Sequence, residues 1–257
     1  MNQYVDINCD LGEGFGPYRM GDDAALMKVI TSANIACGFH AGDPGIMVRT
    51  VQLAVDNGVD IGAHVGFADL QGFGRRVQHL DAAELRAITW YQLGALQGIA
   101  QAQGQKVRHV TFHGALGNMC FADAELAATL MQAIKAFDAT LTVIAPPMTE
   151  METAAQAAGL AVRRVVFADR AYDDQGLLVS RKLPDAVIHD EQRVIERVLR
   201  MFEDRAITSQ SGKRMPVAID SVLVHGDTPG SARLAGLVRA RLAQAGLQVL
   251  PLSHHRS

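Results

Sequence analysis

The chain has 257 residues, 49% of them apolar, which is enough for a large core and is an ordinary length for a single α/β barrel. Lys and Arg number 24 against 27 Asp and Glu, so a net charge of −3 leaves no basic excess for binding nucleic-acid phosphates. An uninterrupted apolar run of about 18 residues, which a membrane span needs, does not occur.

Short β-like runs alternate with longer helical stretches along the chain. The predicted strands are residues 4–8, 33–37, 59–64, 107–112, 141–145, 162–168, 217–224 and a short run at 248–250. Helices are predicted near residues 22–30, 44–57, 81–104, 123–136, 148–158, 190–204 and 229–245. Asp81 with Glu84 forms a capping-box pattern, Asp190 is an expected N-cap, and Gly159 and Gly246 follow predicted helix ends.

Strands that alternate with helices pair in parallel through right-handed crossovers. Seven or eight such units predict an α/β fold, a single irregular TIM-like (β/α) barrel over residues 1–257, with a doubly wound open sheet as the competing arrangement. The longest loops are residues 11–21, 67–80 and 170–189. Loops of this length in a compact domain are often functional.

Polar residues follow most of the predicted strands directly. They are Asn8 and Asp10, His40, His64, His113, Asp169 with Arg170, and His225 with Asp227. The C-terminal ends of parallel strands lie at one rim, where barrel active sites form. We therefore expect these residues to line one site.

Four of the nine histidines follow a predicted strand and precede a glycine by one or two residues: His40, His64, His113 and His225. A single such histidine is often an ordinary loop residue, but four at one rim favour a site. Histidines there can transfer protons, donate hydrogen bonds to a developing anion or bind metal. We expect the others to be structural or surface residues: His79, His109, His189, His254 and His255.

A recognisable phosphate-binding loop is missing from the sequence. The glycine-rich run from Gly12 to Gly16 is followed by Pro17 rather than by a helix, and the only Ser-Gly-Lys run lacks the upstream glycine of a P-loop. Any ATP must therefore bind by unfamiliar means or on another chain. Arg75 and Arg76 could hold a carboxylate or phosphate, or could form a solvated loop pair.

The three cysteines, Cys9, Cys37 and Cys120, are far apart and form no Cys-x-x-Cys pair. This usage is typical of a reducing cytosol, and no signal peptide is recognisable, so we expect a cytoplasmic protein. Cys9 and Cys37 come near the expected rim. We interpret them as small buried core residues rather than nucleophiles.

Several longer motifs occur in a fixed order. They are DINCDLGEGFG (6–16), SANIACGFHAGDP (32–44), GAH (62–64), GFGRR (72–76), YQLGAL (91–96), HGAL (113–116), FADR (167–170) and HGDTP (225–229). Through these motifs, which lie between residues 5 and 229, the chain resembles the LamB/YcsF family. That family is identified with the A subunit of the bacterial ATP-dependent 5-oxoprolinase.

The resemblance implies a barrel akin to the glycoside hydrolase/deacetylase barrels. It also implies a three-subunit enzyme that opens the lactam of 5-oxoproline to glutamate, with two partner subunits and with ATP and Mg bound in the complex. Val65 and Ala68 replace usual prolines, and Thr111, Phe112 and Gly117 replace a lysine, a proline and a tyrosine of the family. Because that lysine could contact a carboxylate or phosphate, its loss bears on the exact substrate.

Lactam opening needs a base for water and donors for the developing negative charge, and phosphorylation of the amide oxygen would activate the ring. We assign proton transfer to Asp10, assisted by His40 or His64. His113 and Asn8 would bind the reacting carbonyl or phosphoryl oxygens.

The other expected substrate contacts are polar side chains of the same rim: Glu13, Arg75, Arg76, Asn118, Asp169, Arg170, His225 and Asp227. An arginine would hold the substrate carboxylate. Asp169 and Asp227 would orient Arg170 and His225.

Two alternative functions remain open. In the first, Asp10, His40, His64 and His113 bind a divalent metal such as Zn, Mn or Ni, and the chain is a metal-dependent amide or lactam hydrolase, similar to a deacetylase. In the second, the chain binds a metabolite while partner chains carry out the chemistry. The sequence also leaves a homo-oligomer open.

Overall fold

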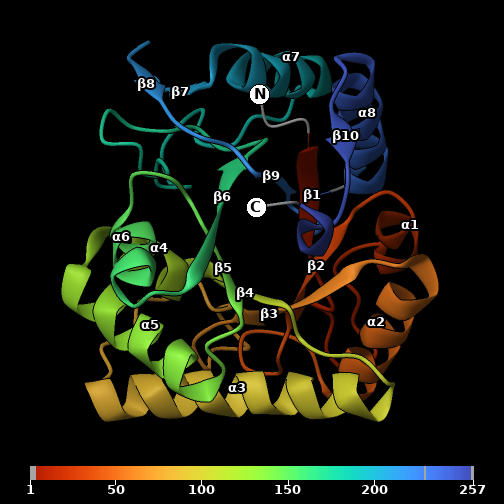
Figure 1. Ribbon diagram of the computed structural model, residues 1–257, viewed down its shortest axis with the longest axis vertical. Coiled ribbons are helices and arrows are strands. Elements are labelled where there is room, and N and C mark those ends of the chain that lie inside the picture. The colour runs from red at the N-terminus through yellow and green to blue at the C-terminus, as the bar shows by residue number, and fades with distance from the viewer. Residues whose placement is uncertain (1–3, 229, 256–257) are drawn as a thin grey trace.

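A computed structural model describes residues 4–228 and 230–255 and shows a parallel β-barrel surrounded by helices (Figure 1). The barrel strands are β1 (Tyr4–Leu11), β2 (Ser32–Ala36), β3 (Asp60–Val65), β4 (His109–Phe112), β5 (Thr142–Ala145), β6 (Ala161–Phe167) and β9 (Ser221–Val224). They pair in parallel in that order, and β9 pairs back with β1. The sheet is therefore closed, which confirms the predicted barrel and excludes the doubly wound sheet.

The helices lie outside the strands, with α3 along one side and α7 and α8 on the opposite side (Figure 1). Their bounds are α1 (Asp23–Met27), α2 (Pro44–Asn57), α3 (Ala82–Ala102), α4 (Gly114–Ala122), α5 (Ala124–Phe137), α6 (Glu150–Ala157), α7 (Glu191–Asp204) and α8 (Ser231–Gln244). The capping box of Asp81 and Glu84 is present at the start of α3, and Asp190 caps α7. None of the helices in the described part of the chain has the length and hydropathy needed to cross a bilayer.

Several elements differ from the sequence prediction. Helix α4 was not expected, because it begins at a glycine without a side-chain cap and is apolar on most sides, so it lacks an amphipathic pattern. Part of the predicted strand 217–224 is loop, preceded by an antiparallel hairpin of β7 (Ala206–Thr208) and β8 (Arg214–Pro216). The short strand expected at 248–250 is confirmed as β10 (Gln248–Val249), which pairs with β1 at the end of that strand opposite the rim. The start predicted for the last helix, Pro229, lies outside the described residues.

Strand β1 shows how the sequence divides the two surfaces of the barrel. Its alternate residues are apolar and belong to the main core: Val5, Ile7, Cys9 and Leu11. Asp6, Asn8 and Asp10 alternate with them and contact polar side chains inside the barrel. Period-two alternation in a closed sheet thus directs the polar residues inward, where TIM barrels usually have branched apolar layers.

Hydrogen-bonded polar side chains fill the barrel interior from the end opposite the rim up to the rim. Asn8 donates from its amide to Ser221 Oγ (2.6 Å), and Asn34 donates to Asn8 Oδ1 (2.8 Å) and to Asp10 Oδ1 (2.9 Å). His109 Nε2 lies 3.0 Å from Asn34 Oδ1. His109 is therefore a structural residue of the barrel interior, and its hydrogen bond to Asn34 supports the rim residues above it.

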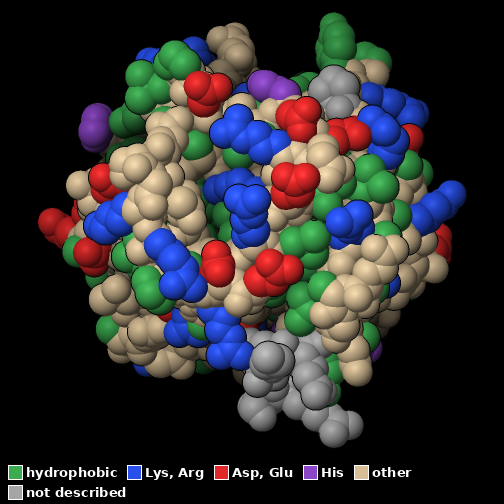
Figure 2. Space-filling model, turned by 90° about the horizontal axis from the view of Figure 1, so that it is seen from above, with side chains coloured by type: hydrophobic (Ala, Val, Ile, Leu, Met, Phe, Trp, Pro, Cys, Tyr) green, Lys and Arg blue, Asp and Glu red, His purple; other side chains and the backbone are tan. Residues whose placement is uncertain are grey.

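The outer surface carries both charge signs. On the face shown in Figure 2, Lys and Arg side chains are interspersed with Asp and Glu, and hydrophobic side chains occur between them.

Candidate active site

A cavity of about 570 Å³ opens at the C-terminal ends of the barrel strands. Its polar and charged lining residues include Asp10, Glu13, His64, Arg75, Thr111, His113, Asn118, Arg170, Arg181, Lys182, His225 and Asp227. Residues from distant parts of the sequence thus face a single space. Most of the rim residues expected from the sequence belong to this lining.

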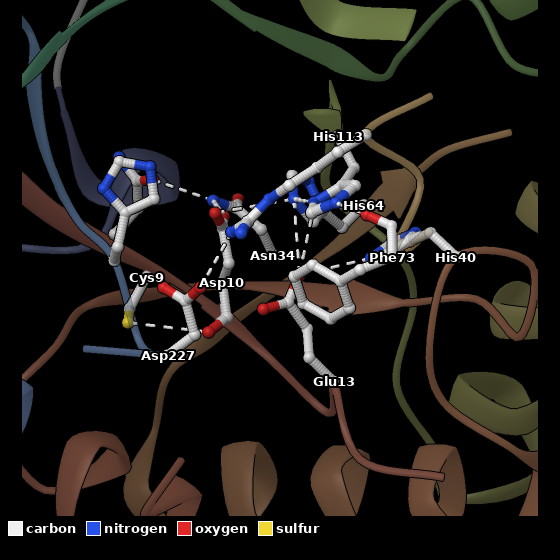
Figure 3. Close-up of polar contacts among 12 residues, drawn as sticks. Cys9, Asp10, Glu13, Asn34, His40, His64, Phe73, His113 and Asp227 are labelled. Carbon is white, nitrogen blue, oxygen red and sulfur yellow. Dashed lines mark hydrogen bonds and ion pairs between the residues drawn. The ribbon is translucent and has the colours of Figure 1, made fainter. Parts of the chain in front are cut away.

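Glu13 lies at the centre of a buried histidine cluster on the cavity floor (Figure 3). Its Oε1 atom is 3.2 Å from His40 Nε2, 3.3 Å from His113 Nδ1 and 3.9 Å from His64 Nε2. His113 Nδ1 is 3.0 Å from His64 Nε2. The four ligand-capable atoms lie within 4.8 Å of one another, so this group could hold a metal ion. Among the described residues, Glu13 takes the place in the cluster that the sequence prediction gave to Asp10.

The protonation state of the cluster follows from its contacts. His113 Nε2 is 2.8 Å from the Phe73 carbonyl oxygen, which can only accept, so this nitrogen carries a proton. Burial, and then repulsion from His113, lower the pKa of His40 to about 4 and that of His64 well below its usual range. Burial opposes ionisation of Glu13, but hydrogen bonds from His113 and His40 hold the pKa of its carboxyl well below the ordinary value.

Glycines allow the histidines to pack this closely. Gly74 has a left-handed φ of +62°, and a Cβ there would lie 2.7 Å from His40 Cβ and 2.8 Å from His113 Cδ2. A Cβ at Gly66 would lie 2.7 Å from His40 Nδ1. The His40 and His113 rings stack in parallel, with centroids 3.8 Å apart and an interplanar angle of 6°.

Asp10 lies beside this cluster at the end of β1. Its Oδ1 accepts from Asn34, and its Oδ2 is 3.5 Å from His64 Nε2. Burial, and then the charge of Glu13, raise the pKa of Asp10 to about 6. A carboxylate with a raised pKa that faces a cavity can accept a proton near neutral pH.

Two ion pairs involve residues of the cavity lining. His225 Nδ1 is 2.7 Å from Asp169 Oδ1, and Arg75 donates to Asp227 Oδ2 over 2.8 Å. Burial would lower the pKa of His225, but Asp169 outweighs it, so this pKa is raised above its ordinary value. The predicted partners are thus corrected, since Asp169 holds His225 and Asp227 holds Arg75.

Cationic side chains from the loop at residues 170–189 face the same cavity. Arg170 donates from its guanidinium to the Val179 carbonyl (2.6 Å) and the Ala186 carbonyl (3.2 Å), so it is largely committed to holding the loop. Arg181 and Lys182 also line the cavity. Sequence reasoning missed both, although the length of this loop and its adjacent cations were a usable signal.

Four predicted site residues do not line the cavity. Asn8 is fully buried below it, and the exposed Arg76 forms an ion pair with the buried Asp69. His40 and Asp169 lie behind the lining and reach it through Glu13 and His225. Competing hydrogen bonds inside the protein explain why Asn8 and Arg76 are not available at the rim.

The cysteines agree with their interpretation as core residues. Cys9, Cys37 and Cys120 are all buried, and the Cys37 thiol donates to the Ile35 carbonyl. Burial raises the pKa of Cys37 to about 12 and that of Cys9 well above its usual value. Neither thiol is therefore activated as a thiolate.

The chain matches the LamB/YcsF family over residues 5–257. It is 55% identical over 249 residues to a Ralstonia nicotianae protein named as a 5-oxoprolinase A subunit, a match that covers 97% of this chain and 96% of that protein. A Rhodopseudomonas palustris protein, also named as the 5-oxoprolinase A subunit, is 52% identical over 97% of this chain and 98% of its own length.

Solved structures agree with the sequence comparison. The crystal structure of a lactam utilization protein from Thermus thermophilus superimposes with a TM-score of 0.91 at 39% identity and covers 97% of this chain and all of that one. The catalytic domain of a peptidoglycan N-acetylglucosamine deacetylase from Eubacterium rectale has a TM-score of 0.53 at 12% identity, over 100% of this chain and 91% of that one, which shows a shared fold alone. The chain therefore belongs to the LamB/YcsF family, which it matches over nearly its whole length.

Proposed function

We propose that this chain is the A subunit of an ATP-dependent 5-oxoprolinase, which hydrolyses the lactam of 5-oxoproline to glutamate. The observation that carries the proposal is the 55% identity, over nearly the whole of both chains, to the Ralstonia nicotianae protein named as a 5-oxoprolinase A subunit. The named lactam utilization protein, with its TM-score of 0.91, supports the same reaction class. A cavity lined by carboxylates, imidazoles and guanidinium groups fits the polar substrate and the proton transfers of this reaction.

Asp10 is the proposed base for the attacking water. Its carboxylate faces the cavity, its Oδ1 is held by the Asn34 amide, and its raised pKa of about 6 makes it a better proton acceptor than an ordinary aspartate. His64 Nε2 lies 3.5 Å from Asp10 Oδ2, beside the proposed base.

Cationic side chains of the cavity lining are the proposed anchor for anionic groups. Arg75, Arg181 and Lys182 line the cavity, and two of them come from the loop at residues 170–189. A guanidinium can bind a carboxylate or phosphate through two parallel hydrogen bonds. Arg181 is the better anchor than Arg170, because the Arg170 guanidinium already donates to two backbone carbonyls.

His225 is proposed to stabilise negative charge on the reacting oxygen. Asp169 accepts from its Nδ1 and raises its pKa, which leaves Nε2–H as a donor on a residue that lines the cavity. A protonated imidazole in a largely buried site is a strong donor to a developing oxyanion. Asn118, on α4 at the same cavity, is a second donor for the substrate.

ATP and Mg are proposed to bind in a complex with two partner subunits. The naming of the relatives as one subunit of an enzyme supports an assembly of several chains. In such an assembly, the open mouth of the cavity has to receive the activated lactam or meet the partner that activates it.

The test is glutamate formation from 5-oxoproline by a mixture of the three subunits, measured with and without ATP. Asp10→Asn should reduce glutamate formation at least about 100-fold, because the proposed base is removed. Asp56→Asn, at an exposed position of α2, is the matched control and should retain full turnover. A complete mixture that hydrolyses no 5-oxoproline would reject the function, and near-normal turnover by Asp10→Asn would reject the assigned base.

A further inference from the structure

The arrangement of Glu13, His64 and His113 points to a metal-binding function of the cavity floor. We propose that Glu13 Oε1, His64 Nε2 and His113 Nδ1 together hold one divalent transition-metal ion of the zinc class. Two imidazoles and one carboxylate are a common ligand set for such ions. This inference concerns the isolated chain and does not depend on the proposed lactam substrate.

The spacing of the three atoms fits a shared ion. Ligand atoms at about 2.0–2.2 Å from a tetrahedral zinc lie about 3.3–3.6 Å from one another. The observed separations are 3.0 Å between the two histidine nitrogens, 3.3 Å from His113 to Glu13 and 3.9 Å from His64 to Glu13. Small side-chain rotations would therefore bring all three atoms to ligand distance of one point.

The tautomer of His113 also fits this role. Because its Nε2–H donates to the Phe73 carbonyl, a His113 side chain that loses its Nδ1 proton on binding a metal ion carries its lone pair on Nδ1, which is the atom that faces Glu13 and His64. A ligating histidine commonly donates its other N–H to a backbone carbonyl in this way. The Nδ1 atom of His64 has no hydrogen-bond partner among residues 4–228 and 230–255, so nothing in these residues prevents Nδ1 from carrying the proton and leaving Nε2 as the ligand.

His40 is a positioning residue in this arrangement rather than a ligand. Its ring lies parallel to that of His113 at a centroid distance of 3.8 Å, so one ion cannot lie in the planes of both rings. The His64 ring is instead nearly perpendicular to His113, at 87°, and the two ring planes can meet at a common ion. His40 Nε2 is 3.2 Å from Glu13 Oε1 and can hold that carboxylate in place.

The proposed site is accessible from the cavity. Glu13, His64 and His113 all belong to the cavity lining, so an ion on them would keep at least one position open for water or substrate. Asp10 lies next to that position, with Oδ2 at 3.5 Å from His64 Nε2. Three protein ligands with an open position are the arrangement found in catalytic rather than structural zinc sites.

The test is metal binding by the full-length chain purified without a metal-affinity tag. The protein is stripped with a chelator and titrated with Zn²⁺ and with Co²⁺, whose absorption bands report the coordination. We expect one equivalent to bind, a rise in melting temperature on Zn²⁺ addition and cobalt bands of a four- or five-coordinate ion.

Glu13→Gln, His64→Gln and His113→Gln should each weaken Zn²⁺ binding by more than about 100-fold, since each removes a ligand. His225→Gln is the matched control, because it changes a histidine of the same cavity outside the ligand set and should keep the affinity within about threefold. Circular dichroism checks that each variant is folded. Two results would overturn the proposal. One is that the stripped wild type binds less than about a tenth of an equivalent of Zn²⁺, and the other is that folded His64→Gln binds Zn²⁺ as tightly as wild type.

Discussion

Glu13 is the residue on which the contacts of the cavity floor converge. It follows β1 in a glycine-rich loop, and sequence reasoning placed it only among the general substrate contacts. Its carboxylate is buried against three histidines, and only 7% of the residue's surface is exposed. A carboxylate that is ionised in such a place needs positive partners or a metal ion, so its environment favours a functional over a purely structural role.

Arg181 gives a test of the anionic anchor at the level of one side chain. Changing Arg181→Met keeps the apolar stem but removes the cation that faces the cavity. We expect the KM for 5-oxoproline to rise about tenfold or more, with a smaller change in kcat, because a guanidinium–carboxylate contact of about 1.5–3 kcal/mol is lost. Steady-state kinetics of the three-subunit mixture measure both constants. Lys106→Met, which removes an exposed cation away from the cavity, is the control and should leave KM unchanged. An unchanged KM in Arg181→Met would refute the role of Arg181 as the anchor of the substrate carboxylate.

The ion pair of His225 and Asp169 predicts a pH dependence of stability. Because Asp169 raises the pKa of His225 above its unfolded value, the pair stabilises the protein below about pH 6.5 and loses that contribution as the pH rises through the folded pKa. The free energy of unfolding of wild type should therefore exceed that of His225→Gln by more at pH 5.5 than at pH 8.5. Urea denaturation at the two pH values measures the difference. The exposed His79→Gln is the control, and an equal difference at both pH values would contradict the prediction.

At the scale of elements, the loop at residues 67–80 can be tested through Gly74. Gly74→Ala should distort the histidine cluster, since its Cβ would lie 2.7 Å from His40 Cβ, in addition to the strain of a positive φ. Gly104→Ala is a matched control, because Gly104 also has a positive φ (+71°) but a Cβ there would meet no atom within 4 Å. We expect Gly74→Ala to lower the melting temperature more than Gly104→Ala and to reduce turnover at least about tenfold. Similar effects of the two variants would show that the cluster tolerates the added methyl group.

Elements with strong local signals were predicted well from the sequence. Helix α2 has the predicted bounds 44–57, and the caps of α3 and α7 are the residues expected from the capping pattern. Helix α4 was missed because tertiary packing, rather than an amphipathic stripe, holds it. The short hairpin of β7 and β8 has only three residues in each strand, too few to show an alternation.

At the scale of the whole molecule, barrel closure explains which site residues were predictable. Parallel strands bring their C-terminal ends to one rim, so Asp10, His64, His113 and His225 could be grouped without coordinates. The side-chain partners could not, because they depend on loop conformation. The unexpected pairing of Asp169 with His225 and of Asp227 with Arg75 shows this limit, as does the position of Asn8 below the cavity.

Asp6 joins three strands where the barrel closes, at the interior end opposite the cavity. Its contacts predict a pH dependence of stability. Its carboxylate accepts hydrogen bonds from Thr31 (2.6 Å), Ser32 (2.7 Å) and Ser221, and burial, opposed by these bonds, raises its pKa to about 6. A raised pKa means that the folded state binds this proton more tightly than the unfolded chain does. The contribution of Asp6 to stability is therefore greatest near pH 4 and falls as the pH rises toward 6.

Asp6→Asn keeps a neutral side chain of the same shape at every pH. The stability of Asp6→Asn relative to wild type should therefore increase between pH 4 and pH 6 by up to about 1.4 kcal/mol per pH unit and should level off above pH 6. Urea denaturation across this range measures the difference in the free energy of unfolding. Asp56→Asn is the exposed control, and its free energy of unfolding should differ little from that of wild type at every pH. A pH-independent difference between Asp6→Asn and wild type would mean that the three hydroxyl donors compensate fully for burial, so that closure of the barrel carries no electrostatic cost at neutral pH.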